Sequence, residues 1–227
     1  MDSIKNNLHK VQERIKDACL AATRKPDSVR LLAVSKTKPS GMVLEAIEAG
    51  QSDFGENYLQ DAMIKISALP EATWHYIGAI QSNKTRDIAA NFDWVHTLAS
   101  EKIARRLHNH RGDSEPPLNV LLQVNLNNEP GKSGIAAHDL PSLIESILDF
   151  DHLSLRGLMA IPEKSDDVAL QRENFQKLAE LQVSIQQQYQ LANFCELSMG
   201  MSTDLEAAIS AGATWIRIGT AIFGERN

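Results

Sequence analysis

The chain alternates between apolar, β-branched runs and helical patterns along almost its whole length, and this alternation restricts the fold more than any other feature. Eight apolar runs recur about every 25 residues, separated by segments whose apolar residues lie three or four positions apart. Such alternation is typical of βα units, whose strands are parallel because each helix returns the chain across the sheet. The sequence therefore predicts an α/β fold with a parallel sheet.

The expected elements can be given as ranges. A first helix is predicted over residues 3–24, because apolar residues recur at helical spacing and Pro26 ends the pattern. The expected strands are 29–37, 53–57, 73–79, 94–99, 119–126, 153–161, 194–200 and 215–223. The expected helices between them are 40–49, 58–69, 84–91, 101–109, 140–150, 166–189 and 203–211. Strand 53–57 has the weakest signal because its apolar content is low.

Two parallel architectures compete, an open doubly wound sheet and a closed barrel. No Gly-x-Gly-x-x-Gly motif follows the first strand, which argues against a dinucleotide-binding sheet. Eight similar units favour a single (β/α)8 TIM barrel, which fits into about 200–250 residues. No linker rich in Gly, Ser or Pro interrupts the sequence. We therefore expect residues 1–227 to form one barrel domain with an extra N-terminal helix.

The end of the last strand adds one expectation. Residues 225–227 follow the predicted strand 215–223 and its Gly224, so no eighth helix is expected there. The N-terminal helix would then be free to cover the seam between the eighth strand and the first.

Charge and composition exclude several classes of function. The formal net charge is −6, which argues against an extended nucleic-acid surface and gives no attraction to anionic lipid. A local positive pocket for an anionic small ligand remains possible on such a protein. The N-terminal residues are polar, and no apolar run approaches the roughly 20 residues that span a bilayer. We expect a cytoplasmic protein that binds neither nucleic acid nor membrane.

No metal or disulfide framework is predicted. The two cysteines, Cys19 and Cys195, lie far apart, and the seven histidines form no His-Glu-x-x-His pattern.

Lys36 is the most unusual residue of the first expected strand. Alternate strand positions share a face, so Lys36 follows Leu32 and Val34, which are apolar. A buried lysine has a lowered pKa and presents the neutral amine that Schiff-base chemistry needs. The alternative is a lysine that only extends out of the barrel mouth into solvent.

The turn after the seventh strand is suited to a phosphate. Glycine and serine residues at 198–202 precede a helical pattern, so free backbone N–H groups and the positive end of a helix dipole are expected there. Thr203 and Glu206 are predicted to form a capping box, and Gly212 to follow the last helical residue. Capping alone would explain these residues equally well.

The eighth strand contributes Arg217, Gly219 and Thr220. Barrels often bind phosphate after strands seven and eight, so this turn supports the previous one. An arginine between Ile216 and Ile218 is costly to bury without an acceptor, and an ion pair within the barrel is the alternative role. Asn57 and Met159 also stand at strand ends.

Several motifs in the same order resemble the YggS/PROSC family of pyridoxal phosphate homeostasis proteins. They are LLAVSKTKP, GENYLQDA, HYIGAIQSNK, LRGLMAI, LSMGMSTDLEAAI and RIGTAIFG. The resemblance covers essentially the whole chain. It implies a barrel similar to the N-terminal domain of alanine racemase, with pyridoxal 5′-phosphate held as a Schiff base on Lys36.

The resemblance also implies a set of cofactor contacts. Residues 198–202 and the glycine–threonine turn would bind the phosphate, Arg217 would face the pyridine nitrogen, and Asn57 would line the pocket. The candidate cofactor residues are Lys36, Asn57, Met159, Ser198, Gly200, Met201, Ser202, Arg217, Gly219 and Thr220.

Three functions are compatible with such a site. The first is a carrier that stores, buffers or delivers the cofactor, transiently to apoenzymes that depend on it. The second is a racemase-like enzyme, which needs a second base; Tyr58 is the one tyrosine expected near the mouth. The third is a Schiff-base aldolase, for which Glu56 is the only candidate acid.

The carrier is favoured. A guanidinium at the pyridine nitrogen cannot accept a proton and leaves the ring neutral, which weakens its capacity to stabilise carbanions. The racemases also take their second base from a C-terminal domain that we do not expect here, and without that domain a monomer is expected.

Overall fold

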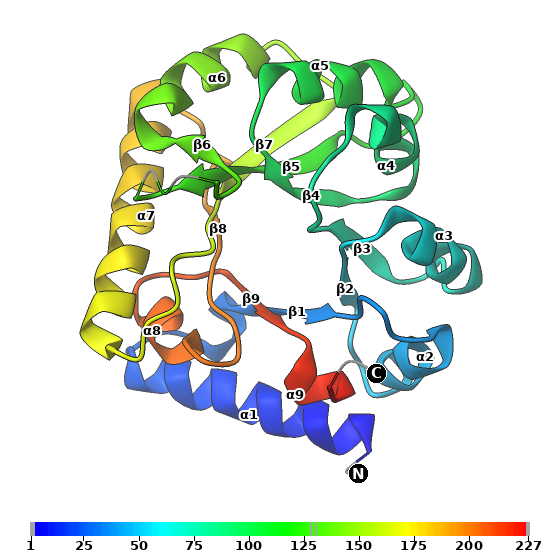
Figure 1. Cartoon of the computed structure of the whole chain (residues 1–227). Helices are drawn as coiled ribbons and strands as arrows, with labels where there is room; N and C mark the ends of the chain where they lie inside the picture. Colours follow the sequence, from blue (N-terminus) through cyan, green and yellow to red (C-terminus); the bar gives the residue numbers. More distant parts are fainter. Residues whose placement is uncertain (1–2, 128, 130, 226–227) are drawn as a thin grey trace.

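The computed structural model describes residues 3–127, 129 and 131–225. Within them, eight parallel strands close into a barrel with helices outside, as Figure 1 shows along the barrel axis. Their order is β1–β2–β3–β4–β5–β7–β8–β9, and β9 pairs with β1. The predicted TIM barrel and its N-terminal helix are therefore confirmed.

The elements have the following bounds. The barrel strands are β1 (Arg30–Val34), β2 (Asp53–Glu56), β3 (Thr73–Tyr76), β4 (Trp94–Leu98), β5 (Leu118–Asn125), β7 (Leu153–Met159), β8 (Glu196–Ser198) and β9 (Trp215–Ile218). The helices are α1 (Ile4–Ala21), α2 (Ser40–Glu48), α3 (Leu59–Ala68), α4 (Thr85–Asn91), α5 (Glu101–His110), α6 (Leu140–Ile147), α7 (Val168–Tyr189), α8 (Leu205–Ser210) and α9 (Thr220–Phe223). Short 3-10 turns cover Pro26–Ser28, Ser82–Lys84 and Ala137–Asp139.

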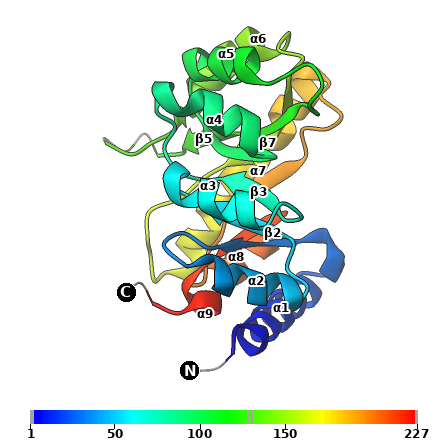
Figure 2. The ribbon, with the colours of Figure 1, turned by 90° about the vertical axis from the view of Figure 1, so that its right-hand side faces the viewer.

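Strand residues separate into two packed layers. Side chains that point outward join the helices in one extended apolar core. Those that point inward form a smaller cluster made of Leu32, Trp94, Leu121, Met159 and Trp215. This filled interior positions the functional side chains at the carboxyl ends of the strands, and Figure 2 shows the loops after β5, β7 and β9 on one side of the barrel.

Helix α1 lies outside the barrel next to α8, α9 and α2 (Figure 1). Ser3 caps it, its side chain accepting from the Asn6 N–H. Two side chains anchor it to the last units: Asn7 Nδ2 donates to Ile222 O at 3.0 Å, and Arg14 pairs with Glu206. The helix therefore occupies the side where β9 meets β1, as the sequence predicts.

The last expected strand ends earlier than predicted. β9 stops at Ile218, and the following residues form the short helix α9 instead of more strand or a bare terminus. The reason is packing, because the apolar side chains of Ile222 and Phe223 are buried. The first strand is also shorter than predicted: β1 ends at Val34, and Lys36 lies in the turn that follows.

The predicted capping box of α8 is wrong. The helix begins at Leu205, and the Asp204 side chain stabilises the preceding turn by accepting the Met201 N–H at 2.6 Å. Glu206 points to Arg14 instead of back along the chain. Gly212, however, has the positive φ of +106° expected just after a helix. The structure also contains a two-residue strand, β6 (Ile135–Ala136), which was not predicted and pairs with β5.

Replacing Gly157 with alanine is expected to destabilise the barrel by about 1–3 kcal/mol or more. Gly157 has a φ of +153°, and a Cβ there would lie 1.9 Å from the carbonyl oxygen of Glu196 on β8. Urea unfolding measures the effect. Gly41→Ala is the control, since a Cβ at Gly41 meets nothing within 4 Å. Equal unfolding midpoints for the two variants would contradict this expectation.

In the described part of the chain, no helix is both long and apolar enough to cross a membrane.

Candidate functional site

A cavity of about 390 Å³ opens at the carboxyl ends of the barrel strands. Its lining residues come from β1, β7 and β9 and from the segments that follow the strands. They are Val34, Lys36, Asn57, Ile77, Met159, Ile161, Lys164, Met201, Ser202, Thr203, Arg217, Gly219 and Thr220.

Eight of the ten residues predicted from the sequence lie together in this lining. The two exceptions are Ser198 and Gly200. Ser198 is fully buried beneath Arg217 and accepts its Nη1 hydrogen bond at 2.8 Å. Gly200 has a φ of +91°, and a Cβ there would lie 2.5 Å from the Ala208 Cβ, so glycine allows the turn to pack against α8.

Five lining residues were not predicted from the sequence. Val34, Ile77 and Ile161 supply apolar surface, Thr203 extends the turn before α8, and Lys164 comes from the loop after β7. The position of Lys164 after a barrel strand was the signal that could have revealed it.

The charge of the cavity is opposite to that of the whole chain. Among the described residues that line it, Lys36, Lys164 and Arg217 are cationic and none is a carboxylate. The chain as a whole carries a formal charge of −6. This local excess of positive charge favours an anionic small ligand.

Lys36 lies in a turn that is held on both sides. The Lys38 N–H donates to Ser35 O at 3.0 Å, and the Thr37 N–H donates to Asp61 Oδ2 at 3.2 Å. Thr37 adopts a left-handed φ of +64°, which is uncommon for a β-branched residue. The turn therefore has a defined shape, and Lys36, partly buried, lines the cavity from it.

A buried ion-pair cluster on the outer side of the barrel fixes the start of this turn. Lys65 of α3 donates to Ser35 O at 2.8 Å, to Glu56 Oε1 at 2.7 Å and to Asp61 Oδ2 at 2.9 Å. The Ser35 hydroxyl also donates to Glu56 Oε1, at 2.6 Å. Burial raises the pKa of Glu56, and the Lys65 and Ser35 hydrogen bonds oppose this effect. The cluster holds the backbone immediately before Lys36.

Arg217 is 6% exposed, with two donors engaged inside the barrel. Nη1 donates to Ser198 Oγ and Nη2 to Ala160 O at 3.0 Å. Burial lowers the pKa of Arg217 to about 10, and Asp204 counteracts part of this effect. No ion pair with a carboxylate, the alternative role, is formed by Arg217 within the described residues. The guanidinium is therefore positioned at the cavity wall by neutral acceptors.

Two backbone turns border the cavity. Residues 201–204 form the turn before α8, where Arg14 donates to Ser202 O at 2.8 Å. Gly219 precedes α9, whose first N–H groups have no acceptor within the helix. A Cβ at Gly219 would lie 3.1 Å from Val34 O, so the turn approaches β1 closely.

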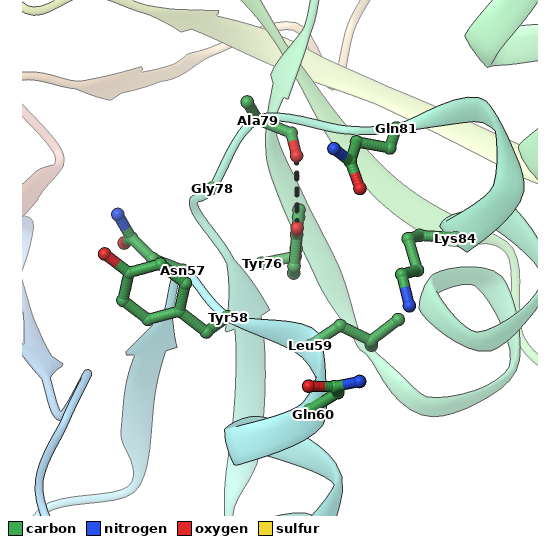
Figure 3. Close-up of a pocket in the computed structure, with 9 residues that line it drawn as sticks. All are labelled: Asn57, Tyr58, Leu59, Gln60, Tyr76, Gly78, Ala79, Gln81 and Lys84. Carbon is green, nitrogen blue, oxygen red and sulfur yellow. Dashed lines mark hydrogen bonds between the residues drawn. The ribbon is translucent and has the colours of Figure 1, made fainter.

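A second cavity, of about 460 Å³, shares Asn57 with the first and is drawn in Figure 3. Tyr76 donates to Ala79 O within it, at 3.2 Å. Tyr58 lines this second cavity and is not among the lining residues of the first. The tyrosine expected near the mouth thus lies in a neighbouring pocket.

Glu56, the candidate acid for an aldolase, is not in the cavity either. Its side chain is fully buried in the ion pair with Lys65 on the outer side of the barrel.

Comparison with known proteins identifies the family. Residues 1–227 match the alanine racemase N-terminal domain family. A pyridoxal phosphate homeostasis protein from Pseudomonas aeruginosa is 52% identical, over 100% of this chain and 97% of its own length. One from Escherichia coli is 44% identical over 100% and 98%. The chain belongs to the pyridoxal phosphate homeostasis protein family.

Solved structures support the same assignment. PipY from Synechococcus elongatus, solved with PLP bound, matches with a TM-score of 0.85 and 35% identity, over 97% of this chain and 100% of PipY. The alanine racemase of Bacillus anthracis matches with a TM-score of 0.73 but only 18% identity, over 99% of this chain and 56% of the racemase. The racemase likeness shows a shared fold only.

Proposed function

We propose that this member of the homeostasis family binds pyridoxal 5′-phosphate in the 390 Å³ cavity, with Lys36 as the covalent attachment, and stores, buffers or delivers it. The main observation is that one cavity combines a lysine just beyond a strand end, two backbone turns and a buried arginine. The names of the close relatives and the PLP-bound PipY structure support the same ligand.

The lining residues fit each part of the cofactor. Ser202, Gly219 and Thr220 offer backbone N–H and hydroxyl donors for a phosphate. The Met201 N–H is already donated to Asp204, so Met201 only lines the cavity beside them. Met159, Val34 and Ile77 offer apolar surface for an aromatic ring. Asn57 Oδ1 is buried without a hydrogen-bond partner, as expected for an acceptor that faces a ligand donor. Ser198 and Gly200 would support this site from beneath.

Arg217 determines how strongly the cofactor could act as an electron sink. When bound, pyridoxal phosphate supplies an aldehyde that captures amines and a ring that accepts electrons. A guanidinium only donates hydrogen bonds, so Arg217 cannot take the proton of a pyridinium and favours a neutral ring nitrogen. The chain therefore supplies an arrangement suited to holding the cofactor more than to carbanion chemistry.

The composition of the lining also supports a carrier over a racemase-like enzyme. Racemisation requires a base on each face of the bound amino acid. Among the described lining residues there is no tyrosine, histidine or carboxylate, and Lys164, from the loop after β7, is the only amine besides Lys36. The proposal includes action as a single-domain monomer inside the cell, with transient contact to apoenzymes that need the cofactor.

The proposal is tested by adding D- and L-amino acids to the cofactor-loaded protein and following chirality and transamination. A carrier shows the absorbance band of lysine-bound cofactor and no sustained turnover. Robust turnover of any amino acid would overturn the carrier assignment, and the absence of any bound cofactor would overturn the proposed ligand.

A further inference from the structure

Arg217 is the first member of a hydrogen-bond chain that leads away from the cavity into the barrel. Its Nη1 contacts Ser198 Oγ at 2.8 Å, and the same oxygen lies 2.9 Å from Nδ1 of His96 on β4. Ser198 and His96 are both fully buried. Ser198, which does not line the cavity, therefore connects the cavity residue Arg217 to a buried imidazole.

The hydrogen-bond chain continues through a second imidazole to a carboxylate. His96 Nε2 lies 3.0 Å from Nδ1 of His75, and His75 Nε2 lies 3.0 Å from Asp53 Oδ1. Asp53 is the first residue of β2, so the hydrogen-bond chain ends at the opposite end of the barrel from the cavity. Trp94 stacks on His75 with the rings 7° from parallel, which restricts rotation of the imidazole.

When both histidines are neutral, the ionised Asp53 at one end fixes the position of each proton along the relay. Arg217 can only donate, and an ionised Asp53 can only accept. His75 must then donate from Nε2 to Asp53 and accept at Nδ1, so His96 donates from Nε2 and accepts at Nδ1. The Ser198 hydroxyl donates to His96 and accepts from Arg217. Arg217, which only donates, is compatible with this assignment, so all four hydrogen bonds run in one direction.

The surroundings favour the neutral histidines that this assignment requires. Burial lowers the pKa of His75, opposed by Asp53 and Asp93. The pKa of His96 lies well below its usual range, mainly because of burial. Electrostatic repulsion from His75, Arg217 and Arg30 lowers it further. Burial disfavours ionisation of Asp53, but hydrogen bonds from His75 and Ser52 outweigh it and lower its pKa.

We propose that Asp53, His75, His96 and Ser198 form a one-directional hydrogen-bond relay that positions Arg217 in the cavity and connects it to a carboxylate at the far end of the barrel. In the described part of the chain no carboxylate forms an ion pair with Arg217, and Asp204 acts on it without direct contact, so the hydrogen bonds through Ser198 are what link the guanidinium to Asp53. This role of the four residues rests on the proposed function, because it acts on the cofactor through Arg217.

The first test needs no cofactor. Long-range nitrogen–proton correlation NMR of isotope-labelled apoprotein reports which ring nitrogen of each histidine carries the proton. Both His75 and His96 are expected as neutral rings protonated at Nε2 near neutral pH. A proton on Nδ1 of either ring, or an imidazolium, would overturn the relay.

The second test follows the bound cofactor. Asp53→Asn keeps an acceptor for His75 but removes the charge, and His96→Leu interrupts the chain. In both, the midpoint of the cofactor's spectral pH titration is expected to shift by about one unit or more. His96→Gln, which can both donate and accept, is expected to restore the wild-type profile. Asp93→Asn is the control, since Asp93 accepts from the Trp74 N–H outside the relay.

The outcomes separate the two proposals. Wild-type protein that binds no cofactor would refute the proposed function, while the NMR result would still decide the proton order. Unchanged pH profiles in Asp53→Asn would overturn the positioning role even if His96→Leu failed to fold. A shift of equal size in Asp93→Asn would also overturn it, because general loss of negative charge would then explain the effect.

Discussion

Replacing Lys65 with methionine is expected to destabilise the protein by about 3–5 kcal/mol, because it leaves a buried carboxylate without its partner. The side chains of Lys65 and Glu56 are 1% and 0% exposed, and their ion pair measures 2.7 Å. The variant also removes the donor to Ser35 O, which holds the backbone before Lys36. Urea unfolding at constant pH measures the change as a shift of the midpoint.

The matched control is Lys177→Met. Lys177 forms an exposed ion pair with Glu173 on α7, and exposed pairs contribute about 0–1 kcal/mol. The double variant Lys65→Met with Glu56→Leu is expected to recover part of the stability, because no buried charge then lacks its counter-charge. If Lys65→Met lost no more stability than Lys177→Met, the buried ion pair of Lys65 with Glu56 would not be what stabilises the backbone before Lys36.

Replacing Lys36 with alanine is expected to abolish covalent cofactor binding, so that the absorbance band of lysine-bound pyridoxal phosphate is lost completely. The reason is chemical, because the aldehyde needs an amine within the cavity and Lys36 extends there from the turn after β1. The apoprotein is expected to stay folded, since Lys36 is only partly buried. Absorbance and circular dichroism of the same sample separate loss of binding from loss of fold.

Lys38→Ala is the matched control. Lys38 is two residues away, and its amine donates to Glu225 O without lining the cavity. The Lys38→Ala variant is expected to show the same absorbance band of lysine-bound cofactor as the wild type. A band that survives in Lys36→Ala would mean that another amine attaches the cofactor, and Lys164 would be the next candidate.

The barrel could be predicted from the sequence because its signal is distributed over eight repeats. Even strand 53–57, with little apolar content, forms β2, because Phe54 packs outward and Gly55 lies against Leu32 inside. The ends of the elements were harder to predict. The residues after Ile218 have strand-like composition, but burial of Ile222 and Phe223 stabilises a helix there.

The candidate site was only partly predictable. Residues at strand ends could be found because the fold brings these ends together, and eight of the ten candidates do line one cavity. Ser198 was predicted as a ligand contact but supports Arg217, since its orientation depends on contacts across the barrel. Lys65 gave no signal, because its partners on β2 and after β1 are set by packing.

Reduction of the cofactor-loaded protein with borohydride, followed by peptide mass mapping, tests the central claim most directly. Reduction makes the bond between the cofactor and its lysine permanent, so the modified residue can be read from the peptide. We expect the mass of the reduced cofactor on the peptide that contains Lys36, at about one per chain. A modification located on Lys164, or on Lys84, which lines the second cavity, would contradict the account, as would no modification after loading.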